Sequence, residues 1–247
     1  MKNLFLVIIT TLLPILSYAQ TSGKATYTET TILSEEQKEK VSQFSGLLSS
    51  MPTPVRQLSF DQVHASYIDV SKSAESESTI EEDDGSVMKI QFVHEQSEDN
   101  LYVNFRDRKI SDKQEFFGKN FLIDRPYDAY AWKLIPEMRE IKGYTCMKAT
   151  SKDAKDNEIT AWYTLSVPVP GGPAGYVGLP GLILEVETEG KKIELTDLVL
   201  QDEVTIKVPT KGKKVSAEKF QKIQDDKMAE LEQMNGGTRT RVINIGG

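Results

Sequence analysis

The sequence predicts a mainly β protein of the α+β class: a curved antiparallel meander or half-barrel, with one helix near each end of the chain packed on it. Three observations support this fold class. Roughly ten short runs with the alternation or β-branched composition of strands follow one another at intervals of about 8–15 residues. Helical spacing of apolar residues occurs only near the two ends of the chain. Strands therefore do not alternate with helices, which argues against a doubly wound parallel sheet.

The start of the chain has the composition of an export signal. Lys2 supplies the positive charge, residues 4–16 are apolar apart from two threonines, and residues 17–19 place small side chains where a signal peptidase cuts. We therefore expect cleavage between Ala19 and Gln20 and a periplasmic or secreted location. The apolar run is short for a transmembrane helix and no later stretch approaches that length, so we expect no stable membrane span.

With 247 residues, the chain is long enough for one substantial core. Ser34 and Gln37 have the spacing of a capping box, which would start an amphipathic helix directly after the first predicted strand. A second helix is expected after Ser216. We divide the chain into a signal peptide (1–19), an antiparallel β domain (20–210) that contains the helix 35–51, and a C-terminal helix and tail (211–247).

Acidic residues outnumber basic ones by 37 to 30, and the formal net charge is -7. A surface that follows a nucleic-acid backbone needs clustered Lys and Arg, so this balance argues against a nucleic-acid partner. It also disfavours non-specific adhesion to an anionic lipid surface. Acidic residues are densest in residues 71–85, which we interpret as a solvated loop or hairpin tip, with a Ca²⁺ site as the alternative.

The residues that usually carry catalysis are scarce. The single cysteine, Cys146, and the two histidines, His64 and His94, lie in predicted strands without a catalytic or metal-binding motif around them. We therefore predict no catalytic residue, no metal site and no cofactor. Cys146 is interpreted as a small buried hydrophobic residue, with a nucleophile or an intermolecular bridge as the alternatives.

One pair of carboxylates leaves an enzymatic function open. Glu185 and Glu187 are two positions apart in a predicted strand, hence on one face, and such a pair could act as acid and base. Their alternation with Leu184 and Val186 favours the simpler interpretation that both glutamates lie on a solvated face.

The most restricted backbone lies in residues 168–181, where nine of fourteen residues are proline or glycine. We interpret Gly178, Pro180 and Gly181 as a structural turn that delivers the following apolar strand into the sheet in a fixed register. Pro180 and Gly181 fit the second and third positions of a type II turn, in which Gly181 would have a positive φ. The alternative is that this rigid segment forms the rim of a binding groove.

Aromatic residues before and within this segment are candidates for binding, because Trp and Tyr combine a large apolar area with a polar tip. Ordinary packing in the core is the favoured interpretation of the aromatic residues, and binding is the functional alternative. The candidate ligand- or partner-binding residues are Trp132, Tyr144, Trp162, Tyr176, Leu179 and Pro180.

Residues 178–183 read Gly-Leu-Pro-Gly-Leu-Ile. This stretch resembles the signature of the GLPGLI family of exported Bacteroidetes proteins, and the resemblance extends over about residues 101–200. Matching segments upstream are residues 121–123, 132–134, 141–149, 161–164 and 168–173. The chain departs from the family at residues 152–157, where a basic turn containing glycine would be expected. No enzymatic activity is established for the family. Its layout is similar to the half-barrel of periplasmic lipoprotein carriers, which hold acyl chains in an apolar concavity.

These observations lead us to expect an exported, non-enzymatic binding or assembly protein of the cell envelope. Its partner would be a lipid-like ligand or a segment of an envelope protein. Two other classes stay open: a carboxylate-based hydrolase or peptidase-like enzyme, and a purely structural component of the envelope.

Overall fold

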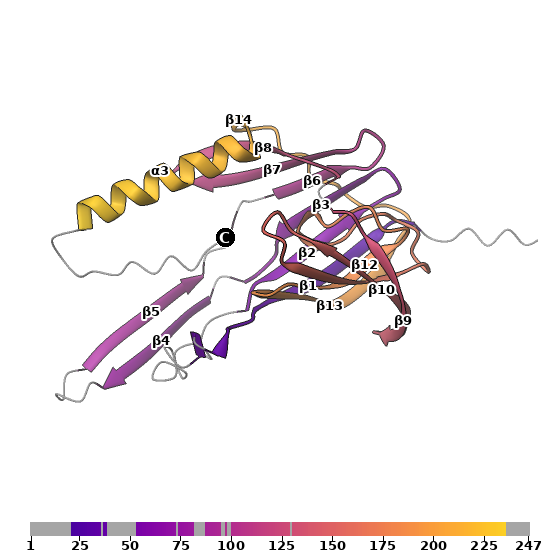
Figure 1. Ribbon diagram of the computed structural model, residues 1–247, viewed down its shortest axis with the longest axis horizontal. Coiled ribbons are helices and arrows are strands. Elements are labelled where there is room, and N and C mark those ends of the chain that lie inside the picture. Colours follow the sequence, from indigo (N-terminus) through magenta and orange to yellow (C-terminus); the bar gives the residue numbers. More distant parts are fainter. Residues whose placement is uncertain are drawn as a thin grey trace, which may run out of the picture.

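The structure is a computed structural model that describes residues 21–35, 37–38, 53–72, 74–81, 87–94, 97, 100–128 and 130–235. Its main element is an open sheet of 12 strands (Figure 1). In chain order, these strands are β1 (Gly23–Thr31), β2 (Val55–Phe60), β3 (His64–Asp69), β6 (Asn100–Asn104), β7 (Lys109–Phe116), β8 (Lys119–Arg125), β9 (Lys133–Ile141), β10 (Tyr144–Lys152), β11 (Glu158–Thr164), β12 (Leu182–Glu187), β13 (Lys191–Leu200) and β14 (Lys213–Ser216).

Across the sheet, the strands lie in the order β14-β8-β7-β6-β3-β2-β1-β13-β12-β11-β10-β9. Every neighbouring pair is antiparallel except β14 and β8, which are parallel. The prediction of a mainly β, largely antiparallel fold is therefore confirmed. A separate antiparallel pair, β4 (Ala74–Glu81) and β5 (Val87–His94), projects from the sheet in Figure 1.

The alternation that predicts the strands also determines which side chains are buried. In β1, Ala25 and Tyr27 are fully buried, whereas Lys24 and Thr26, the residues that precede each of them, are only partly buried. The same spacing buries Leu101 and Val103 in β6. These side chains belong to one large cluster that extends, in the order of the sheet, from Ile110 of β7 to Cys146 of β10 and forms the main core.

The sheet is curled around the segment that joins β11 to β12. Within this segment, the short 3-10 helix η2 (Pro173–Gly175) contacts β3, β6 and β12. Because β2, β1 and β13 lie between β3 and β12 in the sheet, a flat sheet could not bring both to one short helix. Val167, Val169 and Val177 of the same segment are buried in the main core.

The predicted C-terminal helix is confirmed as α3 (Ala217–Asn235). The backbone N–H of Lys219 donates to the Ser216 hydroxyl at 3.3 Å, which caps the start of the helix. Phe220 packs on Phe121 and Phe116 of the sheet, with ring centroids 5.1 and 6.0 Å away. None of the helices in the described part of the chain is long and apolar enough to cross a membrane.

The predicted N-terminal helix is seen only at its start. The Ser34 N–H donates to the Gln37 side-chain oxygen at 2.8 Å, and the Gln37 N–H donates to the Ser34 hydroxyl at 3.2 Å. This is the expected capping box, and helical backbone begins at Glu35. The rest of the helix predicted over 35–51, apart from residues 37–38, lies outside the described residues, as does the predicted signal peptide over 1–19.

The interpretation of residues 71–85 as a loop is wrong for residues 74–81, because they form β4 and pair with β5 along its whole length. The high density of charge in this stretch obscured a two-residue alternation of Glu with Ser, which is a period typical of a strand. The alternative of a hairpin tip concerns residues 82–86, which lie outside the described residues.

Candidate functional site

Residues 165–181 are held to the strands that they join by backbone hydrogen bonds. The N–H groups of Leu182 and Ile183 donate to the carbonyl oxygens of Val167 and Gly171, both at 2.9 Å. Within the segment, the Gly178 N–H donates to the Pro170 oxygen at 3.1 Å. These bonds define one conformation for the proline- and glycine-rich segment.

The predicted type II turn is wrong in its detail. The positive φ occurs at Gly178, with φ 98°, and not at Gly181. Gly181 is required for a different reason: a Cβ at this position would lie 2.7 Å from the carbonyl carbon of Thr164, closer than a real Cβ contact. The backbone of the turn therefore rests directly on the end of β11, and only a residue without a side chain fits there.

Three aromatic rings form a row beside this segment. The ring centroid of Tyr130 is 5.6 Å from that of Trp132 and 4.9 Å from that of Tyr176. The indole N–H of Trp132 donates to the carbonyl oxygen of Val177 at 2.8 Å, which fixes the ring to the segment. All three residues are half-buried. Burial raises the pKa of both tyrosines, so their hydroxyls stay neutral and can donate or accept hydrogen bonds.

The aromatic row covers a second buried cluster, on the part of the sheet near β9. Leu179, next to Gly178, is buried in this cluster, and Trp132, Tyr130 and Tyr176 pack against it. The other buried members are Ala149, Ile159, Ala161, Tyr163, Ile183 and Val186. Met147 of β10 is only partly buried at its margin.

The apolar surface continues from this cluster to the edge of the sheet. β9 is the last strand in the sheet order, and its Leu134 and Met138 are 55% and 67% exposed. Leu134 pairs with Ala149, and Met138 pairs with Met147, across the β9–β10 ladder. Paired residues share a face of the sheet, so both exposed side chains lie on the face of the second cluster. We call Tyr130, Trp132, Leu134, Met138 and Tyr176 the aromatic edge.

The structure brings together three of the six predicted binding residues, Trp132, Tyr176 and Leu179, of which Leu179 is buried. Pro180 is exposed directly after Leu179. Tyr144 and Trp162 do not join this group, because both pack with the main core.

Sequence reasoning missed three members of the aromatic edge: Tyr130, Leu134 and Met138. Tyr130 is two positions before Trp132, and an extended chain places such residues on one side, so spacing could have identified it. No local signal identifies Met138, because alternation does not distinguish an edge strand from a central one.

The expected solvated face is wrong for Glu185, which is only 6% exposed, although Glu187 is exposed. The Glu185 carboxylate lies 2.5 Å from Arg139 Nη2 and 3.9 Å from Lys192 Nζ. β12 is a central strand, and a register shift between Trp162 and Tyr163 of β11 pairs Glu185 with Trp162. The Arg139 guanidinium also lies over the Trp162 ring, with its carbon 4.1 Å from the ring centroid. Glu185 is therefore engaged in an ion cluster that connects β9 to β12 and β13.

Cys146 lies fully buried beside this ion cluster, which confirms its interpretation as a small buried residue. Burial raises the pKa of its thiol to about 11, against the opposing effect of the Arg139 charge. Such a thiol is protonated at neutral pH and is a poor nucleophile. Among the residues that the structure describes, no group of three or more His, Cys, Asp and Glu residues could hold a metal ion.

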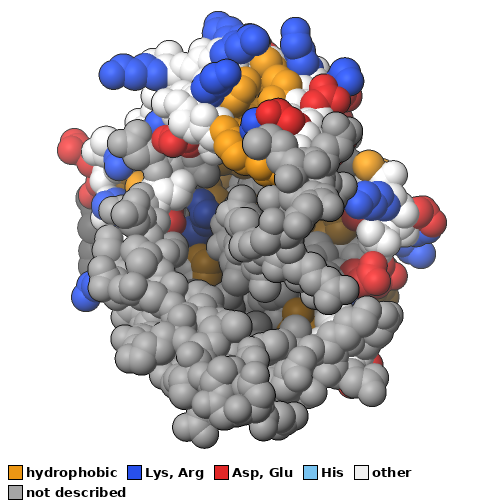
Figure 2. All heavy atoms as spheres, turned by 90° about the vertical axis from the view of Figure 1, so that its left-hand side faces the viewer, with side chains coloured by type: hydrophobic (Ala, Val, Ile, Leu, Met, Phe, Trp, Pro, Cys, Tyr) orange, Lys and Arg blue, Asp and Glu red, His pale blue; other side chains and the backbone are white. Residues whose placement is uncertain are grey.

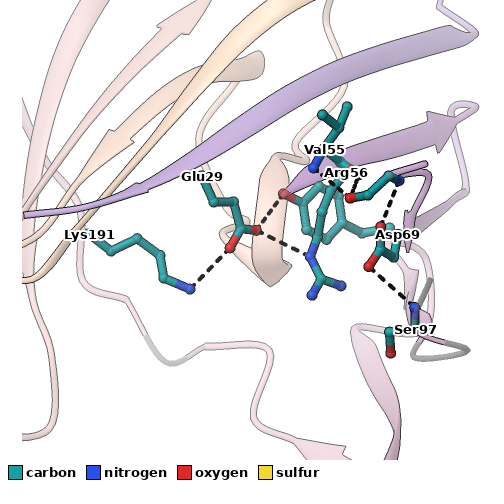
Figure 3. A network of polar contacts seen from close by, with 8 residues as sticks. Glu29, Val55, Arg56, Asp69, Ser97 and Lys191 are labelled. Carbon is teal, nitrogen blue, oxygen red and sulfur yellow. Dashed lines mark hydrogen bonds and ion pairs between the residues drawn. The ribbon is translucent and has the colours of Figure 1, made fainter. Parts of the chain in front are cut away.

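A second polar network joins the central strands (Figure 3). Glu29 of β1 accepts hydrogen bonds from the Tyr67 hydroxyl at 2.9 Å and from Lys191 Nζ at 3.1 Å, and it pairs with Arg56 Nε at 3.6 Å. These contacts connect β1 to β2, β3 and β13, so we interpret the network as structural.

Asp69, at the end of β3, joins the same region to the β4–β5 pair (Figure 3). It accepts the backbone N–H groups of Ser71 at 2.7 Å and Ser97 at 3.3 Å, which lie on either side of that pair in the chain. Burial alone would raise the pKa of Asp69. The hydrogen bonds and the Arg56 charge outweigh it, and the pKa is lowered.

Comparison with known proteins yields one partial family match. A family model described as "Protein of unknown function (Porph_ging)" matches residues 150–185, which extend from the end of β10 through β11 and the joining segment into β12. No curated protein matches the sequence.

Comparison with solved structures finds similarity at low sequence identity. The chain is similar to "Structure of PNGF-II in P21 space group", with a TM-score of 0.50 and 13% identity over 82% of this chain and 33% of that chain. A C2 crystal form of PNGF-II gives a TM-score of 0.49 and 13% identity over 82% and 32% of the two chains. An uncharacterized conserved protein from Thermus thermophilus gives a TM-score of 0.39 and 5% identity over 80% and 91%. This chain spans about a third of the PNGF-II chains, and at this identity the likeness shows the fold alone. The family match is compatible with the GLPGLI resemblance, and the family that it names is one of unknown function.

Proposed function

We propose that this protein is an exported, non-enzymatic binding or assembly protein of the cell envelope, and that it contacts a segment of another envelope protein through the aromatic edge. One observation carries the proposal: the second buried cluster continues to the sheet edge as exposed Leu134 and Met138, with the aromatic row beside them. Contiguous apolar surface of this kind is typical of interaction sites. Trp and Tyr are the residues most enriched among the strongest contacts of protein interfaces.

A protein segment fits this geometry better than an enclosed acyl chain. The curled sheet has the outline of a half-barrel, but Val167, Val169 and Val177 already occupy the space inside the curl, and each is at most 2% exposed. The described residues also form an open groove of about 380 Å³ with a polar and acidic lining, which does not suit an acyl chain. That groove is lined by Asn157, Glu158, Thr160, Glu187, Thr188 and Glu189.

The composition of residues 1–19 supports export, and it leads us to place the partner in the envelope. Sequencing the N-terminus of the protein recovered from its own cells tests this part alone. A mature chain that begins at Gln20 is the expected result. A chain that retains Met1 would contradict export without bearing on the aromatic edge.

Site-specific photo-crosslinking tests the contact. A photoreactive amino acid at Met138 of the full chain, expressed in its own host, is expected to form one discrete adduct with an envelope protein. Met228 of α3 is the matched control, since it is a methionine of similar exposure, 48%, outside the aromatic edge. The same adduct from both positions, or none from Met138, would refute the proposal. A stoichiometric lipid retained in native mass spectrometry would instead favour a lipid-like ligand.

A further inference from the structure

Positive charge is concentrated in one part of this acidic protein. Residues 207–222 contain six lysines and a single acid, Glu218, although the chain has a formal net charge of -7. This stretch leads into β14 and continues through the first turns of α3. The net charge of the chain therefore conceals a local excess of positive charge.

The pairing of β14 places these lysines at one edge of the sheet. Lys213 pairs with Phe121 and Lys214 pairs with Leu122 of β8. Both lysines are exposed, as are Lys211 before them and Lys219 on the first turn of α3. Among the described residues, none of these four lysines has an ion pair with a carboxylate. Lys222 and Lys227, by contrast, pair with Asp226 and Glu230 further along α3.

An exposed aromatic residue lies at the end of the same edge. Phe117, in the turn between β7 and β8, is 53% exposed. α3 runs back along β8 toward this turn, so that Lys227 Nζ lies 5.4 Å from the Phe117 ring. Figure 2 views this end of the molecule and shows hydrophobic side chains gathered at the top, with side chains of Lys or Arg and of Asp or Glu around them. We call Phe117, Lys211, Lys213, Lys214 and Lys219 the basic tip.

We propose that the basic tip binds the surface of a bilayer that contains anionic phospholipid, with the lysines against the phosphates and Phe117 in the interfacial layer. All the cations of the basic tip are lysines, which act as hydrated point charges and suit a diffuse anionic surface. A carboxylate on a protein partner is more often held by the planar fork of arginine. A lysine-rich surface with an exposed aromatic ring has the composition of an interfacial anchor.

Local charge outweighs net charge in this setting because salt screens distant groups. At physiological ionic strength, charges further away than about 8 Å contribute little, so the acidic residues elsewhere on the protein repel the bilayer only weakly. Each lysine close to an anionic membrane strengthens binding by about fivefold. The basic tip therefore supplies an attraction that the composition of the whole chain does not predict.

Vesicle sedimentation of the full chain, without its signal peptide, tests the proposal. We expect binding to phosphatidylcholine–phosphatidylglycerol vesicles, no binding to phosphatidylcholine alone, and loss of binding at high salt. The double variant K213E/K214E is expected to bind at least about 25-fold more weakly. The charge-matched control K109E/K155E changes two exposed lysines away from the basic tip and should bind as the wild type does. Both variants should keep the wild-type melting temperature, because all four side chains are exposed.

The variant Phe117→Asn tests the contribution of the inserted aromatic ring separately from that of the lysine charges. We expect it to weaken binding to the mixed vesicles while the salt dependence stays unchanged. Equal binding to both kinds of vesicle, or equal losses in K213E/K214E and K109E/K155E, would overturn the proposal. Binding to poly-L-glutamate without binding to vesicles would also overturn it and would assign the surface to an acidic protein. None of these outcomes depends on the aromatic edge, so the two proposals fail separately.

Discussion

Replacing Gly181 by alanine tests whether close backbone contact, rather than turn geometry, requires a glycine at this position. The new methyl group would lie 2.7 Å from the Thr164 carbonyl carbon and 3.2 Å from the Leu165 nitrogen. Both atoms belong to the backbone, so no side chain can rotate away to make room. Overpacking of this kind typically costs about 1–3 kcal/mol, and here we expect the upper end, about 3 kcal/mol.

Two other glycines provide the comparison. Gly178 has φ 98°, and a Cβ there would meet no closer atom than one of Trp132 at 3.7 Å, an ordinary van der Waals contact. Alanine there meets backbone strain alone and should cost about 1 kcal/mol. Gly190, in the turn between β12 and β13, has nothing within 4 Å of its Cβ position, so we expect little change.

Thermal unfolding followed by circular dichroism measures the series. For a domain of this size, about 1 kcal/mol corresponds to about 2–4 °C, so G181A should melt about 6–12 °C below the wild type and G178A about 2–4 °C below. Urea unfolding gives the free energies independently. The reasoning is refuted if G181A melts with the wild type, or if G178A is the more damaging of the two variants.

Three further predictions concern other contacts. Arg139→Leu leaves the Glu185 carboxylate buried with only the more distant Lys192 cation; we expect a loss of about 2 kcal/mol in urea unfolding, largely restored in R139L/E185L. Because the pKa of Asp69 is lowered in the folded state, its ionised carboxylate stabilises the fold above the unfolded-state pKa, and this stabilisation is lost as pH falls through the lower folded-state value. Asp69→Asn should therefore flatten the dependence of the unfolding free energy on pH below about pH 4. Met138→Asp should change the unfolding free energy by at most about 0.5 kcal/mol, because the side chain is exposed, yet it should reduce crosslinking from a photoreactive residue at Leu134.

Much of the sheet could be predicted from the sequence because burial and alternation are local properties. Ile159, Ala161 and Tyr163 alternate in the sequence, and all three are buried in β11. The order of the strands is not local: β1 pairs with β13, and the Tyr27–Leu195 pair joins two opposite ends of the sheet domain's sequence. No repeating pattern of residues in the sequence indicates which strands pair with each other.

The two errors at Gly181 of the joining segment and at Glu185 of β12 have a common physical origin. Alternation places Glu185 on a solvated face, but a register shift and the side chain of Arg139, on a strand that is not adjacent, bury it. The residue preferences of a type II turn assign the positive φ to Gly181, but the actual constraint is that the backbone of Thr164 lies too close for a Cβ at this position. In both cases a residue far away in the sequence determines the outcome, and local rules cannot include it.

β14 could not be predicted from the sequence either, because its formation depends on contacts with residues that are distant in the chain. Its four residues contain two lysines and one buried side chain, Val215, which is too little for a strand to be predicted. It forms because it extends the sheet beside β8, where Val215 joins Phe121, Ile123 and Phe220 in a separate small cluster. That pairing is also what gathers the lysines of the basic tip at one edge.

Direct contacts couple the segment of residues 165–181 to the aromatic edge, and this coupling leads to a last prediction. Trp132 is hydrogen-bonded to Val177, and Leu179 is buried beneath the aromatic row, so a change in the segment must reach the edge. The reverse does not hold, because Leu134 and Met138 are largely exposed and cover little of the segment. We therefore expect G178A to alter the quenching of Trp132 fluorescence by acrylamide, measured against the buried Trp162, the other tryptophan of the chain, whereas M138D leaves it unchanged. An effect of M138D as large as that of G178A would mean that the edge helps to hold the segment in place, and would make Met138 a structural residue rather than a contact.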